Sequence, residues 1–217
     1  HAVCRLVDVR MRSDYFPANF FEQPDDKRKQ EAREIQAWLD RGKPSRPPHA
    51  VKVRAIKDYA ARFSIRTLIE TGTYLGDRVE SCRGTFERVV SVELSRDLFD
   101  RARKRFAHDP GVTIEHGDSS EVLPRVLAQI DAPVLFWLDA HYSGGNTARG
   151  AELTPIFGEL ETIFAHPVRD HVILIDDAGD FVGAEGYPTL AELEAFVQSR
   201  RPGIRFEVSD DIIRIHR

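Results

Sequence analysis

Three aspartates follow two apolar segments at the points where strands are expected to end. Asp139 comes directly after 134–138, and Asp176 and Asp177 come directly after 172–175. The carboxyl ends of parallel strands lie side by side, and converging carboxylates repel one another unless a cation is present or protons are shared. Because neither segment contains a lysine, and because carboxylate oxygens suit Mg²⁺, we expect a magnesium site on these three aspartates. An arginine that reaches Asp139 or Asp176 from elsewhere in the fold is the rival explanation.

His141 stands two residues beyond Asp139. A neutral imidazole at this position is able to act as a general base or as a metal ligand, and a purely structural histidine is the alternative. The glycine-rich stretch 143–147 beside it predicts a loop, either a substrate lid or an ordinary connection.

A pair of glycines, Gly72 and Gly76, follows the first expected strand. Glycine lets the backbone turn sharply and approach a ligand closely. The spacing is GxxxG and differs from the GxGxxG of dinucleotide-binding folds. A tight strand-to-helix turn without any ligand explains this piece equally well when it is taken alone.

Acids also follow the second and third expected strands. Glu93 ends the second strand, about twenty residues after Gly72, where a carboxylate accepts two hydrogen bonds from a ribose diol in nucleotide-binding folds. After the third strand, Asp118 and Ser119 stand where a side chain and backbone would contact an adenine edge. Asp118 is alternatively a helix N-cap, and the two roles are compatible.

Short apolar segments alternate with helical patterns from Thr67 onward. The segments with strand character are Thr67–Glu70, Val89–Glu93, Val112–Ile114, Val134–Leu138, Val172–Ile175, Ile204–Val208 and Ile212–His216. The helical patterns are Asp25–Arg41, Ala50–Phe63, Ser95–Phe106, Asp118–Gln129, Pro155–Phe164 and the stretch that follows Thr189. Residues Asp210 and Asp211 separate the last two strands too briefly for a helical crossover, which predicts an antiparallel hairpin.

This alternation predicts an α/β fold, with a doubly wound, mostly parallel seven-stranded sheet that ends in an antiparallel hairpin. Ligands of such sheets bind at the carboxyl ends of the strands, near the switch point of strand order. The acids and glycines described above all stand at such ends. We expect two parts, a helical extension over 1–49 and a ligand-binding domain over 50–217.

The composition limits the classes of function. The chain has 217 residues, of which 41% are hydrophobic and 30% charged, with a formal net charge of −4. This balance gives no sign of a nucleic-acid partner, and no apolar run approaches the roughly 20 residues of a membrane span. The two cysteines, Cys4 and Cys82, are too few for a disulfide framework and form no CxxC motif. We expect a cytoplasmic protein without a membrane partner.

Taken together, these segments resemble the class I S-adenosylmethionine (SAM)-dependent methyltransferases, especially the metal-dependent O-methyltransferases of the catechol type. The family's first motif is similar to Glu70–Gly76, its ribose-binding acid falls on Glu93, and its adenine-side segment resembles 117–124. Its first metal aspartate falls on Asp139, and its second strand-end pair falls on 176–177. The bacterial sugar O-methyltransferases of macrolide pathways have a similar Asp-Asp pair there.

The resemblance covers about residues 50–217 and implies a set of site residues. The cofactor-binding set is Glu70, Gly72, Thr73, Tyr74, Gly76, Glu93, Asp118 and Ser119. It implies Mg²⁺ on Asp139, Asp176 and Asp177, and methyl transfer to a hydroxyl of a small molecule or sugar. Where the catechol enzymes have a lysine base three residues after the first metal aspartate, this chain has Tyr142, so His141 or Tyr142 would accept the proton.

Other functions stay open at this stage. A metal-free methyltransferase would use His141 as base and the aspartates structurally. An NAD-dependent oxidoreductase also places an acid such as Glu93 at a ribose, although the missing GxGxxG and the closing hairpin count against it. A non-catalytic nucleotide-binding module is a further alternative. Residues 1–49 would either pair subunits in a homo-oligomer or cover the acceptor.

Overall fold

The computed structural model describes residues 24–139, 155–184 and 186–217, and these contain the predicted seven-stranded sheet. The strands are β1 (Thr67–Thr71), β2 (Arg88–Glu93), β3 (Val112–His116), β4 (Leu135–Leu138), β5 (Val172–Ile175), β6 (Arg205–Ser209) and β7 (Ile212–His216). Each lies within two residues of its predicted range. β1 to β5 are parallel, and β7 runs antiparallel between β5 and β6. The predicted closing hairpin is therefore confirmed.

The strand order is β3-β2-β1-β4-β5-β7-β6. The chain moves outward from β1 to β3 and then returns to place β4 on the other side of β1. The switch point of the sheet therefore lies between β1 and β4, whose carboxyl ends are Thr71 and Leu138. Ligands of doubly wound sheets bind in the crevice outside such a point.

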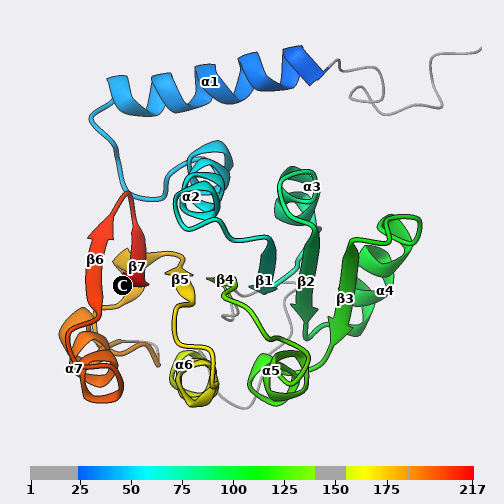
Figure 1. The fold of residues 1–217 in the computed structure, drawn as a ribbon. Coiled ribbons are helices and arrows are strands. Elements are labelled where there is room, and N and C mark those ends of the chain that lie inside the picture. The colour runs from blue at the N-terminus through cyan, green and yellow to red at the C-terminus, as the bar shows by residue number, and fades with distance from the viewer. Residues whose placement is uncertain (1–23, 140–154, 185) are drawn as a thin grey trace, which may run out of the picture.

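Helices cover both faces of this sheet (Figure 1). The helices are α1 (Pro24–Asp40), α2 (His49–Arg62), α3 (Asp77–Cys82), α4 (Arg96–Arg105), α5 (Ser119–Leu127), α6 (Ile156–Ala165) and α7 (Leu190–Arg200), with a 3₁₀ turn η2 (Ala178–Asp180). One buried cluster joins the sheet to α5, α6 and α7, and a second joins it to α2, α3 and the end of α4. Of the described helices, none combines the length and apolar character of a membrane span.

Local signals fix the ends of several helices. Ser95 caps α4 by accepting from the Leu98 amide, and Thr189 forms a capping box with Glu192 on α7. Asp118 caps α5 as predicted, but its carboxylate accepts from the amide and hydroxyl of Ser120, so the cap forms on the second helical residue. The helices at α1, α2 and α6 match their predicted ranges closely.

The segment that joins α1 to α2 is attached to the distant C-terminal hairpin. Lys43 Nζ lies 3.0 Å from Asp210 Oδ1, and the Arg46 amide donates to Asp211 Oδ2 over 3.0 Å. The Trp38 indole, at the end of α1, donates to the Pro44 carbonyl and is buried. These contacts fix the chain just before α2 begins. The division predicted at residues 49/50 stays a prediction.

Candidate cofactor and acceptor site

The glycine turn lies at the carboxyl end of β1. Gly72 and Gly76 have φ values of 89° and 81°, a left-handed conformation that favours glycine. A Cβ built on Gly76 would lie 2.8 Å from Phe106 Cε2, so the site has no room for a side chain. The Gly72 amide donates to the Val92 carbonyl at the end of β2, which ties the turn to the neighbouring strand.

Glu93 supports the turn from the end of β2. One carboxylate oxygen accepts from the Tyr74 amide and the other from the Ser95 amide, each over 2.8 Å. Burial raises the pKa of Glu93, and these amide hydrogen bonds oppose the rise. A carboxylate oxygen has a second lone pair, so the position is compatible with the predicted ribose contact.

Two of the predicted cofactor residues lie under the turn, and one lies at the surface. Glu70 and Thr73 are buried, and both bond the Ser91 hydroxyl, at 2.5 Å to Glu70 Oε2 and 2.6 Å to Thr73 Oγ1. They shape the turn from inside the protein. Tyr74, with 54% of its surface exposed, is accessible from solvent.

The predicted adenine-side residues begin α5. Asp118 is half-buried and serves as the N-cap described above, while Ser119 is buried. Gly117, with φ of 141°, turns the chain out of β3, and its amide bonds the Glu93 carbonyl. The structure thus brings the ends of β1, β2 and β3 together around one edge of the sheet.

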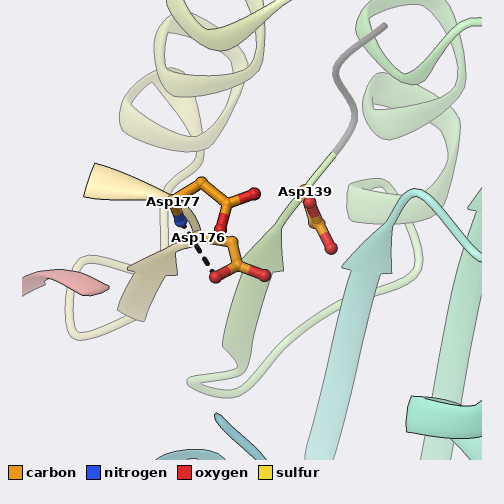
Figure 2. Close-up of side chains that lie close together, drawn as sticks. All are labelled: Asp139, Asp176 and Asp177. Carbon is orange, nitrogen blue, oxygen red and sulfur yellow. Dashed lines mark hydrogen bonds between the residues drawn. The ribbon is translucent and has the colours of Figure 1, made fainter. Parts of the chain in front are cut away.

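The three predicted metal-binding aspartates also meet at this edge. Asp139, Asp176 and Asp177 each offer a carboxylate oxygen within 4.8 Å of the others (Figure 2). Asp176 Oδ1 accepts from the Asp177 amide over 2.9 Å, and Asp177 has a left-handed φ of 51°, which aspartate tolerates. We call Asp139, Asp176, Asp177 and the adjoining Glu70 the acidic cluster.

Two basic side chains, neither of them predicted for the site, reach into the acidic cluster. Arg78 in α3 places Nη1 2.9 Å from Asp139 Oδ2 and 3.2 Å from Glu70 Oε1. Its Nη2 lies 3.4 Å from Asp176 Oδ2. Lys52 in α2 places Nζ 2.7 Å from Asp176 Oδ1 and 3.1 Å from Asp177 Oδ1. The rival explanation for the acids, an arginine from elsewhere in the fold, is therefore the arrangement found, with a lysine added.

The pKa values show how strongly the cluster is buried. Desolvation raises the pKa of Glu70 to about 7, against the lowering effect of Arg78. Burial, together with the neighbouring charge of Asp139, raises the pKa of Asp176 to about 7. Lys52 itself has a raised pKa because attraction to Asp176 and Asp177 outweighs its desolvation. Lys52 is therefore held in its charged form.

The donor chemistry of the aspartates suits Mg²⁺, but their surroundings do not. Both oxygens of Asp176 already contact cations, since Lys52 Nζ also lies 2.8 Å from Oδ2. Asp139 gives one oxygen to Arg78, and Asp177 gives one to Lys52. An ion bound between Asp176 and Asp177 would have to displace the Lys52 ammonium, so the residues present do not fit a resident magnesium ion.

A further acid that the sequence did not indicate lies beside the switch point. Glu159 in α6 is buried, and its Oε1 has no hydrogen-bond partner among the described residues. Burial raises its pKa to about 7, although the Ser119 and Thr71 hydroxyls act to lower it. Its position in an amphipathic helix gave no signal, because an inward-facing glutamate has the same spacing as the core residues around it. The predicted bases His141 and Tyr142 lie outside the described residues.

Solved structures share this architecture over most of their length. The O-methyltransferase from Bacillus cereus in complex with S-adenosylhomocysteine (SAH) superposes with a TM-score of 0.59 at 14% identity, covering 91% of this chain and 93% of that one. The chain has the class I methyltransferase fold. The O-methyltransferase TomG from Streptomyces achromogenes, involved in tomaymycin synthesis and solved with SAM, gives a TM-score of 0.57 at 17% identity, covering 85% of this chain and 87% of that one.

A third methyltransferase-fold neighbour is the SAH-bound methyltransferase PaMTH1 from Podospora anserina. It gives a TM-score of 0.55 at 18% identity and covers 89% of this chain and 88% of that one. The sequence itself matches no protein-family model and no curated protein. The methyltransferase fold is thus shared at sequence identities of 14–18%.

Proposed function

We propose that this chain is a SAM-dependent methyltransferase that acts on a hydroxyl oxygen of a small molecule or sugar. The observation on which the proposal depends is the position of the site residues. The glycine turn, Glu93, Asp118 and the acidic cluster all stand at the carboxyl edge of the sheet, around its switch point. The neighbours named above, which share this fold, were solved with SAM or SAH, and two are described as O-methyltransferases.

Each part of the site has a proposed task. The backbone between Gly72 and Gly76 approaches the cofactor, Glu93 accepts hydrogen bonds from its ribose, and Asp118 contacts its adenine. When bound, SAM supplies an electrophilic methyl group on a sulfonium. Holding the acceptor oxygen in line with that group contributes much of the rate by removing the entropy cost of encounter.

The acidic cluster lies where an acceptor hydroxyl would be bound. The side chains of Asp139 and Asp177 are 17% and 20% exposed, whereas that of Asp176 is 1% exposed, so an acceptor reaches the first two. During transfer the acceptor oxygen forms a bond to the methyl carbon while the carbon–sulfur bond breaks. The hydroxyl proton passes to a carboxylate of this pair or to His141, which leaves a methyl ether and SAH.

Titration of the protein with SAM, SAH and NAD tests the cofactor. We expect SAM and SAH to bind in the micromolar range, roughly −8 kcal/mol, and NAD not to bind. Gly72→Val should remove binding, because a β-branched side chain fits neither the positive φ nor a close ligand. A folded variant that binds SAM normally would show that the turn is not the cofactor site, and preferential NAD binding would favour the oxidoreductase.

Incubation with SAM and a panel of phenols, sugars and polyketides tests the acceptor. The expected product is an acceptor that has gained one methyl group on oxygen, detected by mass spectrometry, together with an equal amount of SAH. Binding of SAM without turnover on any member of the panel would favour a nucleotide-binding module. Size-exclusion chromatography of the same sample tests whether the chain forms a homo-oligomer.

A further inference from the structure

Lys52 and Arg78 do more than neutralise the negative charge of the acidic cluster. The Lys52 ammonium lies between the carboxylates of Asp176 and Asp177, at 2.7 Å and 3.1 Å. A cation that bridges two strand-end carboxylates holds the place that a divalent ion would take between the same oxygens. Only 14% of the Lys52 side chain is exposed, so water does little to weaken the contacts.

Arg78 is held firmly on the other side of the cluster. Its guanidinium contacts Asp139, Asp176 and Glu70 and stacks on the indole of Trp137, with 4.6 Å between its Cζ and the ring centroid. A planar guanidinium fits such forked carboxylate contacts and aromatic stacking better than an ammonium does. Removing it from the cluster would require a buried charge to lose three partners at once.

We propose that Lys52 and Arg78 replace the divalent cation, so that this site works without a bound metal ion. The replacement of the metal ion is independent of the proposed methyl transfer. Only its consequence for the reaction rests on that proposed function. Lys52 then acts as a positioning residue. It fixes Asp176 and Asp177 and supplies the positive potential that favours an acceptor oxygen as it loses its proton.

The two cations reach the cluster because helices α2 and α3 begin beside it. Both residues lie in the first turn of their helix, where the helix dipole disfavours a positive charge. The acidic cluster offsets that cost. The contacts of Lys43 and Arg46 with the C-terminal hairpin fix the chain before α2 and thereby place Lys52.

Divalent-ion binding distinguishes this arrangement from a metal site. We would titrate the purified protein with Mn²⁺, as a spectroscopic substitute for Mg²⁺, and follow free Mn²⁺ by electron paramagnetic resonance. The wild type should bind Mn²⁺ weakly, and its thermal unfolding should be the same in Mn²⁺ and in EDTA.

The Lys52→Met variant should behave in the opposite way. Removing the ammonium opens the bridge between Asp176 and Asp177, and we expect Mn²⁺ affinity to rise at least about tenfold. Mn²⁺ should then raise the unfolding temperature of the variant, because a ligand of the folded state stabilises it. Lys52→Arg should bind Mn²⁺ as weakly as the wild type. Lys57→Met, the same substitution on the same helix, should also match the wild type.

Two results would overturn the inference. One is tight Mn²⁺ binding by the wild type, with turnover lost in EDTA and restored by Mn²⁺. The other is a folded Lys52→Met variant whose Mn²⁺ affinity is unchanged. If that variant does not fold, the wild-type titration decides alone. Because these titrations need neither SAM nor an acceptor, a protein that binds no SAM would refute the proposed function without affecting this result.

Discussion

At the end of β2, Glu93 accepts hydrogen bonds from the amides of Tyr74 and Ser95. At the ends of β4 and β5, the acidic cluster instead depends on the side chains of Lys52 and Arg78. The Glu93 carboxylate is stabilised by the dipoles of two backbone amides. The acidic cluster is stabilised by the formal charges of two side chains from separate helices. Backbone amides remain after any substitution other than proline, whereas a side-chain cation is lost with a single substitution. The two halves of the site should therefore respond differently to mutation.

The largest expected effect comes from removing Arg78. Arg78→Met leaves three carboxylates without their shared partner in a buried setting, and we expect a loss of about 3–5 kcal/mol in the free energy of unfolding. Urea denaturation measures this loss. Arg83→Met, which removes an arginine with ion pairs at the surface, should change stability by less than about 1 kcal/mol. Equal losses in both variants would contradict the comparison.

Glu159 sharpens the comparison, because among the described residues its carboxylate is stabilised by the hydroxyls of Ser119 and Thr71 and by neither an amide nor a cation. Its folded pKa of about 7 lies above the ordinary value of 4.5, so the folded state binds the extra proton. The stabilisation that protonated Glu159 gives to the folded state is fully present below pH 4.5 and is lost as the pH rises through 7. Glu159→Gln should therefore be more stable than the wild type at pH 8, by about 2–3 kcal/mol.

The gain in stability of Glu159→Gln over the wild type should disappear at pH 4.5. Urea denaturation of both proteins at pH 4.5 and at pH 8 gives the difference between them at each pH. A difference that is the same at both pH values would mean that Glu159 does not titrate in this range. A folded Glu159→Asp variant, which keeps the carboxyl group, should retain the pH dependence.

The smallest expected effect concerns Glu93. Glu93→Ala removes the acceptor for two backbone amides and the proposed ribose contact, and we expect SAM affinity to fall by about 1.5–3 kcal/mol. Isothermal titration calorimetry measures the change. Glu87→Ala, an exposed glutamate just before β2, should leave the affinity unchanged. An unchanged affinity in Glu93→Ala would remove this residue from the cofactor site.

The fold could be predicted from the sequence because its signals are local. Continuous apolar strands such as Val172–Ile175, the cap at Ser95 and the brief separation of the last two strands each depend on neighbouring residues. The convergence of Asp139 with Asp176 and Asp177 could also be predicted, because the end of a parallel strand has a known place in the sheet. The helix over Asp77–Cys82, with only six residues, was too short for its period to be recognised.

The partners of the acids could not be predicted, because they depend on which helix packs over which strand. Lys52 stands 124 residues before Asp176, and Arg78 stands 61 residues before Asp139. One signal was present in the sequence, namely Lys52 in the first turn of the helix predicted over Ala50–Phe63. A cation at that position opposes the helix dipole and indicates an acidic partner elsewhere in the fold.

The attachment of residues 43–46 to the C-terminal hairpin has a consequence for the order of assembly on the ribosome. Lys43 is synthesised 167 residues before its partner Asp210. Domains form as their residues emerge in order, and contacts between distant residues wait for the later partner. The chain before α2 therefore lacks its contacts with the hairpin until the hairpin has been made. Lys52 should reach its place in the acidic cluster only after the sheet is complete, which makes charge balance at this site a late event in the protein's maturation.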